Sequence, residues 1–100
     1  MLYSRNVIRS FRSKALRNFW QKGKAGAVNP EWVRRIRLIL STMDAAESPT
    51  ELDLPGLAFH ALKGVRKGRF ALTVSGNWRI TFKWQGPDAV EVELEDYHGK

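Results

Sequence analysis

Three neighbouring residues near the end of the chain can do proton chemistry. Asp96-Tyr97-His98 is followed only by Gly99 and Lys100. A carboxylate, a phenol and an imidazole can each give or take a proton, and histidine changes its charge near neutral pH. Cleavage of a phosphodiester without a metal ion needs a base for the ribose 2′-hydroxyl, an acid for the leaving oxygen and cations on the phosphorane. This sequence therefore favours ribonuclease chemistry as the first hypothesis.

The other groups that this chemistry requires lie earlier in the chain. Lys63 and Arg79 can bind a phosphate, and His60 is the only other histidine besides His98. Either histidine alone is more often a surface or structural residue. With Asp96 the pair could also form a two-histidine, one-carboxylate metal site. The strongly cationic surroundings disfavour a divalent cation, so we expect neither a metal ion nor a cofactor.

Basic residues exceed acidic ones by 17 to 10, which gives a net charge of +7. Residues 1–40 hold ten Lys and Arg side chains and one acid, Glu31. A second basic group follows, comprising Lys63, Arg66, Lys67, Arg69, Arg79 and Lys83. Such a field attracts a polyanion, either a nucleic-acid backbone or an acidic protein. We take Arg66, Lys67 and Arg69 as candidate RNA-binding residues.

Length and composition predict one globular domain spanning residues 1–100. The chain is 43% hydrophobic, contains four Trp and five Phe, and has no cysteine. Absence of cysteine fits a reducing compartment. No apolar run approaches the ~20 residues that cross a bilayer, and the N-terminal sequence lacks the hydrophobic region of a signal peptide. We expect a cytoplasmic protein without a membrane anchor.

The chemistry-bearing residues sit on or beside a predicted antiparallel meander. Hydrophobic residues alternate with polar or small ones in three stretches: 69–75, 78–84 and 89–98. Gly76-Asn77 and Gly86-Pro87-Asp88 are typical turn sequences between strands. The expected inward residues of the last stretch are Val90, Val92 and Leu94. The polar side of the middle strand carries Arg79, Thr81 and Lys83, for which cross-strand salt bridges with Glu91, Glu93 and Glu95 are the simplest role, the one we prefer for Lys83.

The first half of the chain predicts a strand and two helices. The strand covers residues 6–11, and Ser13 caps a helix from Lys14 to about Gln21. Asn29-Pro30-Glu31 begins a second helix, which ends before Ser48-Pro49. Its core stripe consists of Trp32, Ile36, Ile39, Leu40 and Met43, while Arg34, Arg35 and Arg37 face away. Residues 57–64 form a short extended or single-turn piece. The fold is therefore α+β, with both helices on one face of an antiparallel sheet.

The sequence closely resembles the HigB toxins of the RelE/ParE superfamily. The resemblance covers nearly the whole chain and is strongest in five stretches: 59–64, 66–69, 74–82, 88–89 and 95–98. Gly-Asn-Trp-Arg-Ile-Thr-Phe combined with a terminal Asp-Tyr-His is its most specific part. The resemblance implies a compact domain similar to microbial ribonucleases. It also implies a type II toxin that cuts messenger RNA in the decoding site of the ribosome and so inhibits translation and growth.

By this resemblance the active-site positions fall on His60, Lys63, Arg79, Asp96, Tyr97 and His98. We assign His98 as the main acid/base group and Asp96 as the residue that orients it. Lys63 and Arg79 bind the scissile phosphate, Tyr97 stacks on a base or relays a proton, and His60 assists placement. Strand alternation puts Asp96 and His98 on one face and Tyr97 on the other, so the strand must twist or end for all three to meet.

The resemblance also names partners and leaves two alternatives open. The expected partners are the small ribosomal subunit with its message and a helix-turn-helix antitoxin similar to HigA, in a hetero-oligomer that contacts DNA only through the antitoxin. The first alternative is a ParE-like toxin, which poisons DNA gyrase on the same fold and does not need the terminal Asp-Tyr-His. The second is a non-catalytic RNA- or ribosome-binding module, which composition alone would equally support.

Overall fold

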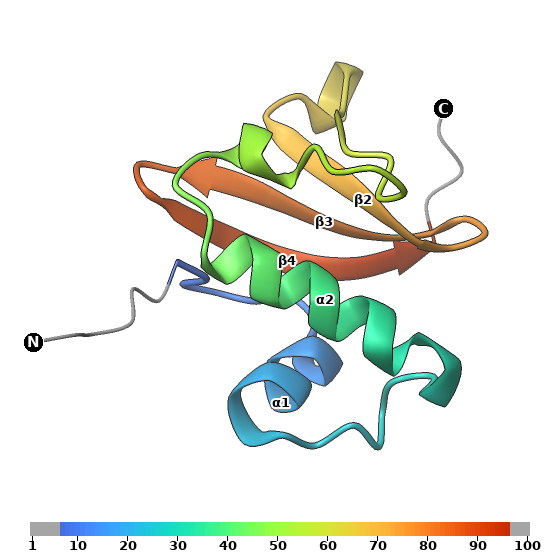
Figure 1. The fold of residues 1–100 in the computed structure, drawn as a ribbon. Coiled ribbons are helices and arrows are strands. Elements are labelled where there is room, and N and C mark those ends of the chain that lie inside the picture. The colour runs from blue at the N-terminus through green and yellow to red at the C-terminus, as the bar shows by residue number, and fades with distance from the viewer. Residues whose placement is uncertain (1–6, 97–100) are drawn as a thin grey trace, which may run out of the picture.

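Residues 7–96 form a two-layer α+β structure in the computed structural model, which describes this part of the chain. An antiparallel sheet makes one layer, and two helices lie on one side of it (Figure 1). Within residues 7–96 no helix is long and apolar enough to span a membrane. The elements are α1 (Lys14–Lys22), α2 (Val33–Asp44), β1 (His60–Ala61), β2 (Arg69–Ser75), β3 (Trp78–Gln85) and β4 (Asp88–Asp96), with short 3₁₀ turns at Pro30–Trp32, Pro49–Leu52 and Gly64–Arg66.

Both helices begin at the predicted caps. The Oγ atom of Ser13 accepts a hydrogen bond from the backbone N–H of Leu16 at 3.1 Å, and Gly23 ends α1 in the left-handed conformation with φ of 68°. Asn29 accepts from the N–H of Glu31 at 2.9 Å. The second helix differs in one respect, since its first turn, Pro30–Trp32, is 3₁₀ and α2 proper starts at Val33.

The predicted meander is confirmed, and a short fourth strand extends it. The strand order is β1-β2-β3-β4, with each neighbouring pair antiparallel. Strand β1 has only two residues and comes from the stretch expected to be extended or a single turn. It pairs at the edge of β2, where His60 lies opposite Ala71. This edge position brings His60 onto the sheet.

The N-terminal segment runs beside β4, but as two isolated parallel bridges rather than a continuous strand. Ile8 bridges Ala89, and Phe11 bridges Val92. The predicted strand was therefore placed at the right edge but assigned too regular a structure; its first residue, Asn6, lies outside the described residues. A side chain competes for the backbone here, because Asp44 at the end of α2 accepts the N–H groups of Val7 and Ile8 at 2.9 and 3.0 Å.

A β-bulge corrects the predicted alternation in β4. Thr81 pairs with Glu93 and Lys83 pairs with Val90, so β4 contains one extra residue between these pairs. Glu91 lies in this interval with φ of 53°. The extra residue shifts the parity, so that the side chain of Ala89 is fully buried whereas Val90, predicted to face the core, is only half-buried. Bulges commonly bend a strand in this way.

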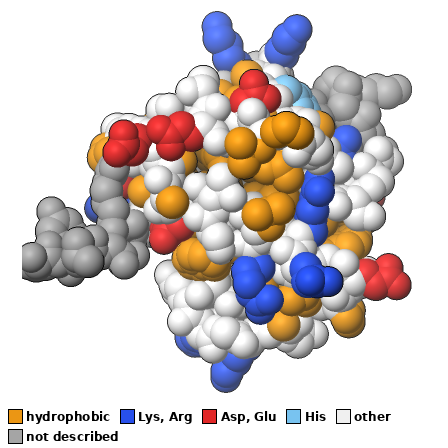
Figure 2. All heavy atoms as spheres, in the orientation of Figure 1, with side chains coloured by type: hydrophobic (Ala, Val, Ile, Leu, Met, Phe, Trp, Pro, Cys, Tyr) orange, Lys and Arg blue, Asp and Glu red, His pale blue; other side chains and the backbone are white. Residues whose placement is uncertain are grey.

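The core lies between the helices and the sheet. The stripe predicted on α2 is confirmed, since Ile36, Ile39, Leu40 and Met43 are fully buried. Trp32 is half-buried and packs against Trp78 of β3, with ring centroids 5.3 Å apart. The main partners from α1 and the sheet are Leu16, Phe19, Leu72, Ile80, Phe82 and Val92. On the face of the molecule seen in Figure 2, hydrophobic side chains gather among Lys and Arg side chains.

Candidate active site

The sheet face opposite the helices carries two of the candidate catalytic residues. Residues directly opposite each other in neighbouring antiparallel strands share a face. One row on this outer face consists of His60, Ala71, Thr81 and Glu93, and the next row consists of Thr73, Arg79 and Glu95. The register therefore places His60 and Arg79 on the same face, in adjacent rows and two strands apart.

His60 is exposed at the edge strand and has a fixed ring orientation. Its Nδ1 atom lies 2.9 Å from the backbone carbonyl oxygen of Ala58. A carbonyl oxygen can only accept, so Nδ1 carries the proton in this contact. In the neutral ring Nε2 is then the nitrogen that can accept a proton. Ala58 itself has a left-handed backbone, with φ of 53°.

Lys63 and Arg79 are cations without an acidic partner among residues 7–96. Lys63 is exposed and begins the turn after β1. The Nη1 group of Arg79 donates to the carbonyl oxygens of Gly76 and Trp78, and its Nε is buried without a hydrogen-bond partner in the described structure. No carboxylate of the described residues therefore compensates either positive charge, and both can act on a phosphate.

Asp96 ends β4 on the other face of the sheet. It is exposed and lies opposite Trp78, so strand alternation puts it on the face of Leu94 rather than that of Arg79. The described residues thus bring His60 and Arg79 together but not Asp96. Tyr97 and His98 follow Asp96 directly and lie outside the described residues, so their predicted roles stay predictions. Within residues 7–96 no group of three His, Asp or Glu side chains is placed to hold a metal ion.

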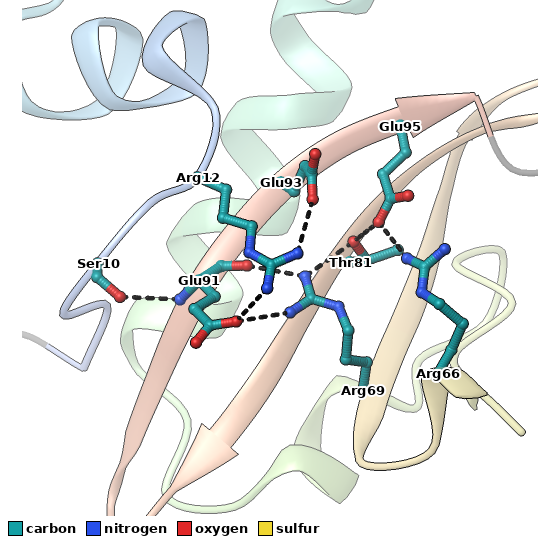
Figure 3. A network of polar contacts seen from close by, with 8 residues as sticks. All are labelled: Ser10, Arg12, Arg66, Arg69, Thr81, Glu91, Glu93 and Glu95. Atoms are coloured by element: carbon teal, nitrogen blue, oxygen red, sulfur yellow. Dashed lines mark hydrogen bonds and ion pairs between the residues drawn. The ribbon is translucent and has the colours of Figure 1, made fainter. Parts of the chain in front are cut away.

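Two of the three candidate RNA-binding residues, Arg66 and Arg69, belong to a polar network on the outer face (Figure 3). Arg69 is only 6% exposed, and its Nη2 donates to Thr81 Oγ1 at 3.1 Å and to the Glu91 carbonyl oxygen at 2.8 Å. Arg66 forms an ion pair with Glu95, which also accepts from the Thr81 hydroxyl. Lys67, by contrast, is exposed.

The glutamates of β4 pair with different cations from those expected. Arg12, which precedes α1, contacts Glu91 at 2.9 Å and Glu93 at 3.6 Å. Lys83 is exposed and forms no ion pair with any described residue, so its predicted cross-strand salt bridge is wrong. The reason is geometric: Arg12 comes from the N-terminal segment beside β4, whereas Arg66 and Arg69 come from the turn before β2 and from the start of β2.

Burial and nearby charges shift the pKa values of two side chains in this network, Glu95 and Arg69. Burial alone raises the pKa of Glu95, but hydrogen bonds from Thr81 and Arg66 and the nearby positive charges outweigh it, so the pKa of Glu95 is lowered. Burial lowers the pKa of Arg69, and the charges of Arg12 and Arg66 lower it further. An arginine nevertheless stays protonated at neutral pH. The network is thus ionised and held between α1, the loop before β2, and β4.

Sequence reasoning missed one structural arginine. Arg35 was expected to face solvent, but its Nε donates to the Thr73 carbonyl oxygen at 3.1 Å and its Nη2 donates to the carbonyl oxygen of Gly56. The signal was present in the spacing. Arg35 stands three residues after Trp32 and four before Ile39, which places it on the buried side of α2.

Two comparisons with known proteins give matches that cover most of the chain. The family model described as "RelE-like toxin of type II toxin-antitoxin system HigB" matches residues 9–98, a span that contains all six candidate catalytic positions. The curated protein "Endoribonuclease HigB" of Proteus vulgaris is 39% identical over 92 residues, which is 92% of this chain and 100% of the relative.

Proposed function

Because this chain belongs to the HigB family of RelE-like toxins of type II toxin–antitoxin systems, we propose that it is an endoribonuclease that cuts translated messenger RNA. The observation that carries the proposal is that His60 and Arg79 share the outer face of the sheet. There His60 presents Nε2 on the same face as Arg79, whose charge no carboxylate among residues 7–96 compensates. The acid/base sequence Asp96-Tyr97-His98 begins where β4 ends beside the same hairpin.

The proposed reaction is an in-line attack by the ribose 2′-hydroxyl on the neighbouring phosphorus. The bond from phosphorus to the 2′-oxygen forms and the bond to the 5′-oxygen breaks, leaving a 2′,3′-cyclic phosphate and a 5′-hydroxyl. His98 is the proposed main acid/base group, oriented by Asp96. Tyr97 stacks on a base or relays a proton. Lys63 and Arg79 stabilise the charge that develops on the phosphate oxygens, and His60 helps to place it.

The ribosome is the proposed site of action. A net charge of +7 favours binding to ribosomal and messenger RNA. A toxin of a type II system has an antitoxin partner. We infer further that this antitoxin is a helix-turn-helix protein similar to HigA, that DNA is contacted only through it, and that the complex acts in the cytoplasm.

The test is expression of the wild-type chain beside the His98→Ala variant, with mapping of 5′-hydroxyl ends on cellular messages. Cuts inside translated codons that need ongoing translation and vanish in the variant are the expected result. Growth arrest without such cuts would contradict the proposal and indicate a gyrase poison, for which accumulation of cleaved DNA is the readout. Equal cutting by both chains would remove His98 from the mechanism.

A further inference from the structure

A basic pocket lies on the outer face, at the end of β2 and β3 opposite to the row of Arg79. Its volume is about 220 Å³, and it is lined by Arg12, Val65, Arg66, Lys67, Arg69 and Lys83. Five of these six residues are cationic, and no carboxylate of the described chain lines it. Arg69 and Lys83 are opposite each other in the sheet, four residues along the strands from the Thr73–Arg79 pair. That separation corresponds to roughly 14 Å.

The charges around this pocket do not balance. The arginines that line it pair with three carboxylates, those of Glu91, Glu93 and Glu95. Lys67 and Lys83 are exposed and pair with no carboxylate in the part of the chain that the structure describes. Among the described residues, five cations against three anions leave two positive charges in excess, and both are carried by the exposed, flexible side chains of the two lysines.

Arg69 gives a second, independent indication that the pocket binds a ligand. It is 6% exposed, and its two terminal nitrogens are occupied by Thr81 and Glu91. Its Nε–H is buried without a hydrogen-bond partner among residues 7–96. A buried N–H without an acceptor is unfavourable. Burial lowers the pKa of Arg69, the charges of Arg12 and Arg66 lower it further, and those of Glu95 and Glu91 oppose the shift.

We propose that this pocket binds a backbone phosphate of the RNA substrate, at a phosphodiester other than the one that is cleaved. The proposal rests on the proposed endoribonuclease function. A phosphate offers several acceptor oxygens to converging Lys and Arg donors, and the separation of roughly 14 Å along the strands from the row of Arg79 is too long for one group to occupy both places. Two anchored phosphates would hold the strand across the sheet and position the scissile bond.

The decisive variant is Lys67→Gln combined with Lys83→Gln. Both side chains are exposed and lack ion pairs with described residues, so folding should be unchanged, which thermal unfolding checks. Lys22→Gln combined with Lys24→Gln is the matched control, because it removes the same charge from exposed positions at the end of α1. The probe is a single-stranded RNA oligonucleotide in which 2′-O-methyl groups prevent cleavage, titrated at several salt concentrations.

The pocket variant should bind more weakly than the wild type, and its plot of log affinity against log salt should be shallower by about 0.7, the slope for one phosphate on a single strand. The control variant should keep the wild-type slope. Neutral methylphosphonates, placed at one position at a time, should weaken wild-type binding at a non-scissile position and leave the pocket variant unaffected there. On programmed ribosomes the pocket variant should need more toxin than the control variant for half-maximal cleavage.

Equal salt slopes for the pocket and control variants would overturn the proposal, as would methylphosphonate sensitivity that persists in the pocket variant. Unchanged RNA binding with weakened antitoxin binding would assign the pocket to an acidic protein instead. A wild-type chain that binds the oligonucleotide but cuts no message on programmed ribosomes would contradict the proposed function alone, since the binding measurements would still decide the role of the pocket.

Discussion

Arg79 and Glu95 lie directly opposite each other in β3 and β4 but form no ion pair with each other. Glu95 is occupied by Arg66 and by the Thr81 hydroxyl. Arg79 instead donates to the backbone carbonyls of Gly76 and Trp78 at the hairpin. A cross-strand neighbour would otherwise neutralise the arginine, so the network around Glu95 keeps the charge of Arg79 available for a phosphate.

Replacing Arg79 with alanine should lower the cleavage rate by about 100-fold or more, the usual cost of removing one donor that stabilises a transition-state charge. Stability should fall by at most about 1 kcal/mol, because the lost hydrogen bonds go to hairpin carbonyls. Single-turnover cleavage and urea unfolding measure the two effects. Arg79→Lys should recover part of the rate, and Lys24→Ala is the control for lost charge. A fully active Arg79→Ala chain would rule out the proposed role.

Glu95 should make the stability of the protein depend on pH. Its pKa in the folded state is lowered, so it lies below the value of about 4.3 expected in the unfolded chain. At pH values between these two pKa values the unfolded state binds more protons than the folded state. The ionised Glu95 therefore stabilises the fold fully above its pKa in the unfolded chain, and this stabilisation is lost as the pH falls through its pKa in the folded state. Glu95→Gln should therefore cost about 1–2 kcal/mol at pH 7 and almost nothing in strong acid.

Urea unfolding of both chains from pH 7 down to about pH 3 tests this expectation. Glu47→Gln is the control, since the Glu47 side chain is exposed and forms no hydrogen bond or ion pair with the described residues; only its backbone N–H donates, to Glu51. Two parallel curves, with a constant difference between wild type and Glu95→Gln across the whole range, would show that the ionisation of Glu95 does not contribute.

The sequence predicted most of the fold because its local signals agree with one another. Ser13 and Asn29 act as helix caps, and the Gly76-Asn77 turn separates strands with the expected bounds. The bulge at Glu91 could not be predicted, since an extra residue in one strand leaves no mark in a period-two pattern that looks continuous. The parity of Val90 was wrong for this reason.

The site was predictable as a set of residue types but not as an arrangement. The edge position of His60 depends on the pairing of a two-residue strand, which local sequence does not specify. The partners in the ion pairs could not be predicted from the sequence either. Arg12 stands about 80 residues before Glu91 in sequence, and only the parallel contact of the N-terminal segment with β4 brings their side chains to 2.9 Å. Long-range packing, not propensity, decides such partners.

Ala58→Gly should stabilise the protein by about 0.5–1 kcal/mol. An L-residue at φ of 53° is strained, and this exceeds the extra entropy that glycine loses on folding. The contact with His60 uses only the backbone oxygen of residue 58, so cleavage should be unaffected. Thermal unfolding measures the change. Ala61→Gly in β1 is the matched control and should be destabilising; stabilisation by both substitutions would indicate a different cause.

Arg35→Ala should lower the free energy of unfolding by about 1–2 kcal/mol, because two carbonyl oxygens lose a charged donor. Cleavage should also decrease, since Arg35 fastens the loop at Gly56 that leads into His60 and its edge strand. Arg34→Ala removes the same charge from an exposed neighbour and should change stability by less than about 0.5 kcal/mol. Equal effects of the two substitutions would mean that the loss of one positive charge from α2, and not the loss of the two hydrogen bonds, lowers the free energy of unfolding.

Asp44→Ala should release the N-terminal segment from α2 and cost about 1–3 kcal/mol, because the N–H groups of Val7 and Ile8 lose their shared acceptor. Asp44→Asn should cost much less, since the amide oxygen can still accept both hydrogen bonds. Urea unfolding gives the energies, and hydrogen exchange at the amide of Ile8 reports the loss locally. Asp53→Ala, at an exposed position, should change neither quantity. If Asp44→Ala and Asp44→Asn were equally stable, the carboxylate would not hold the segment against α2.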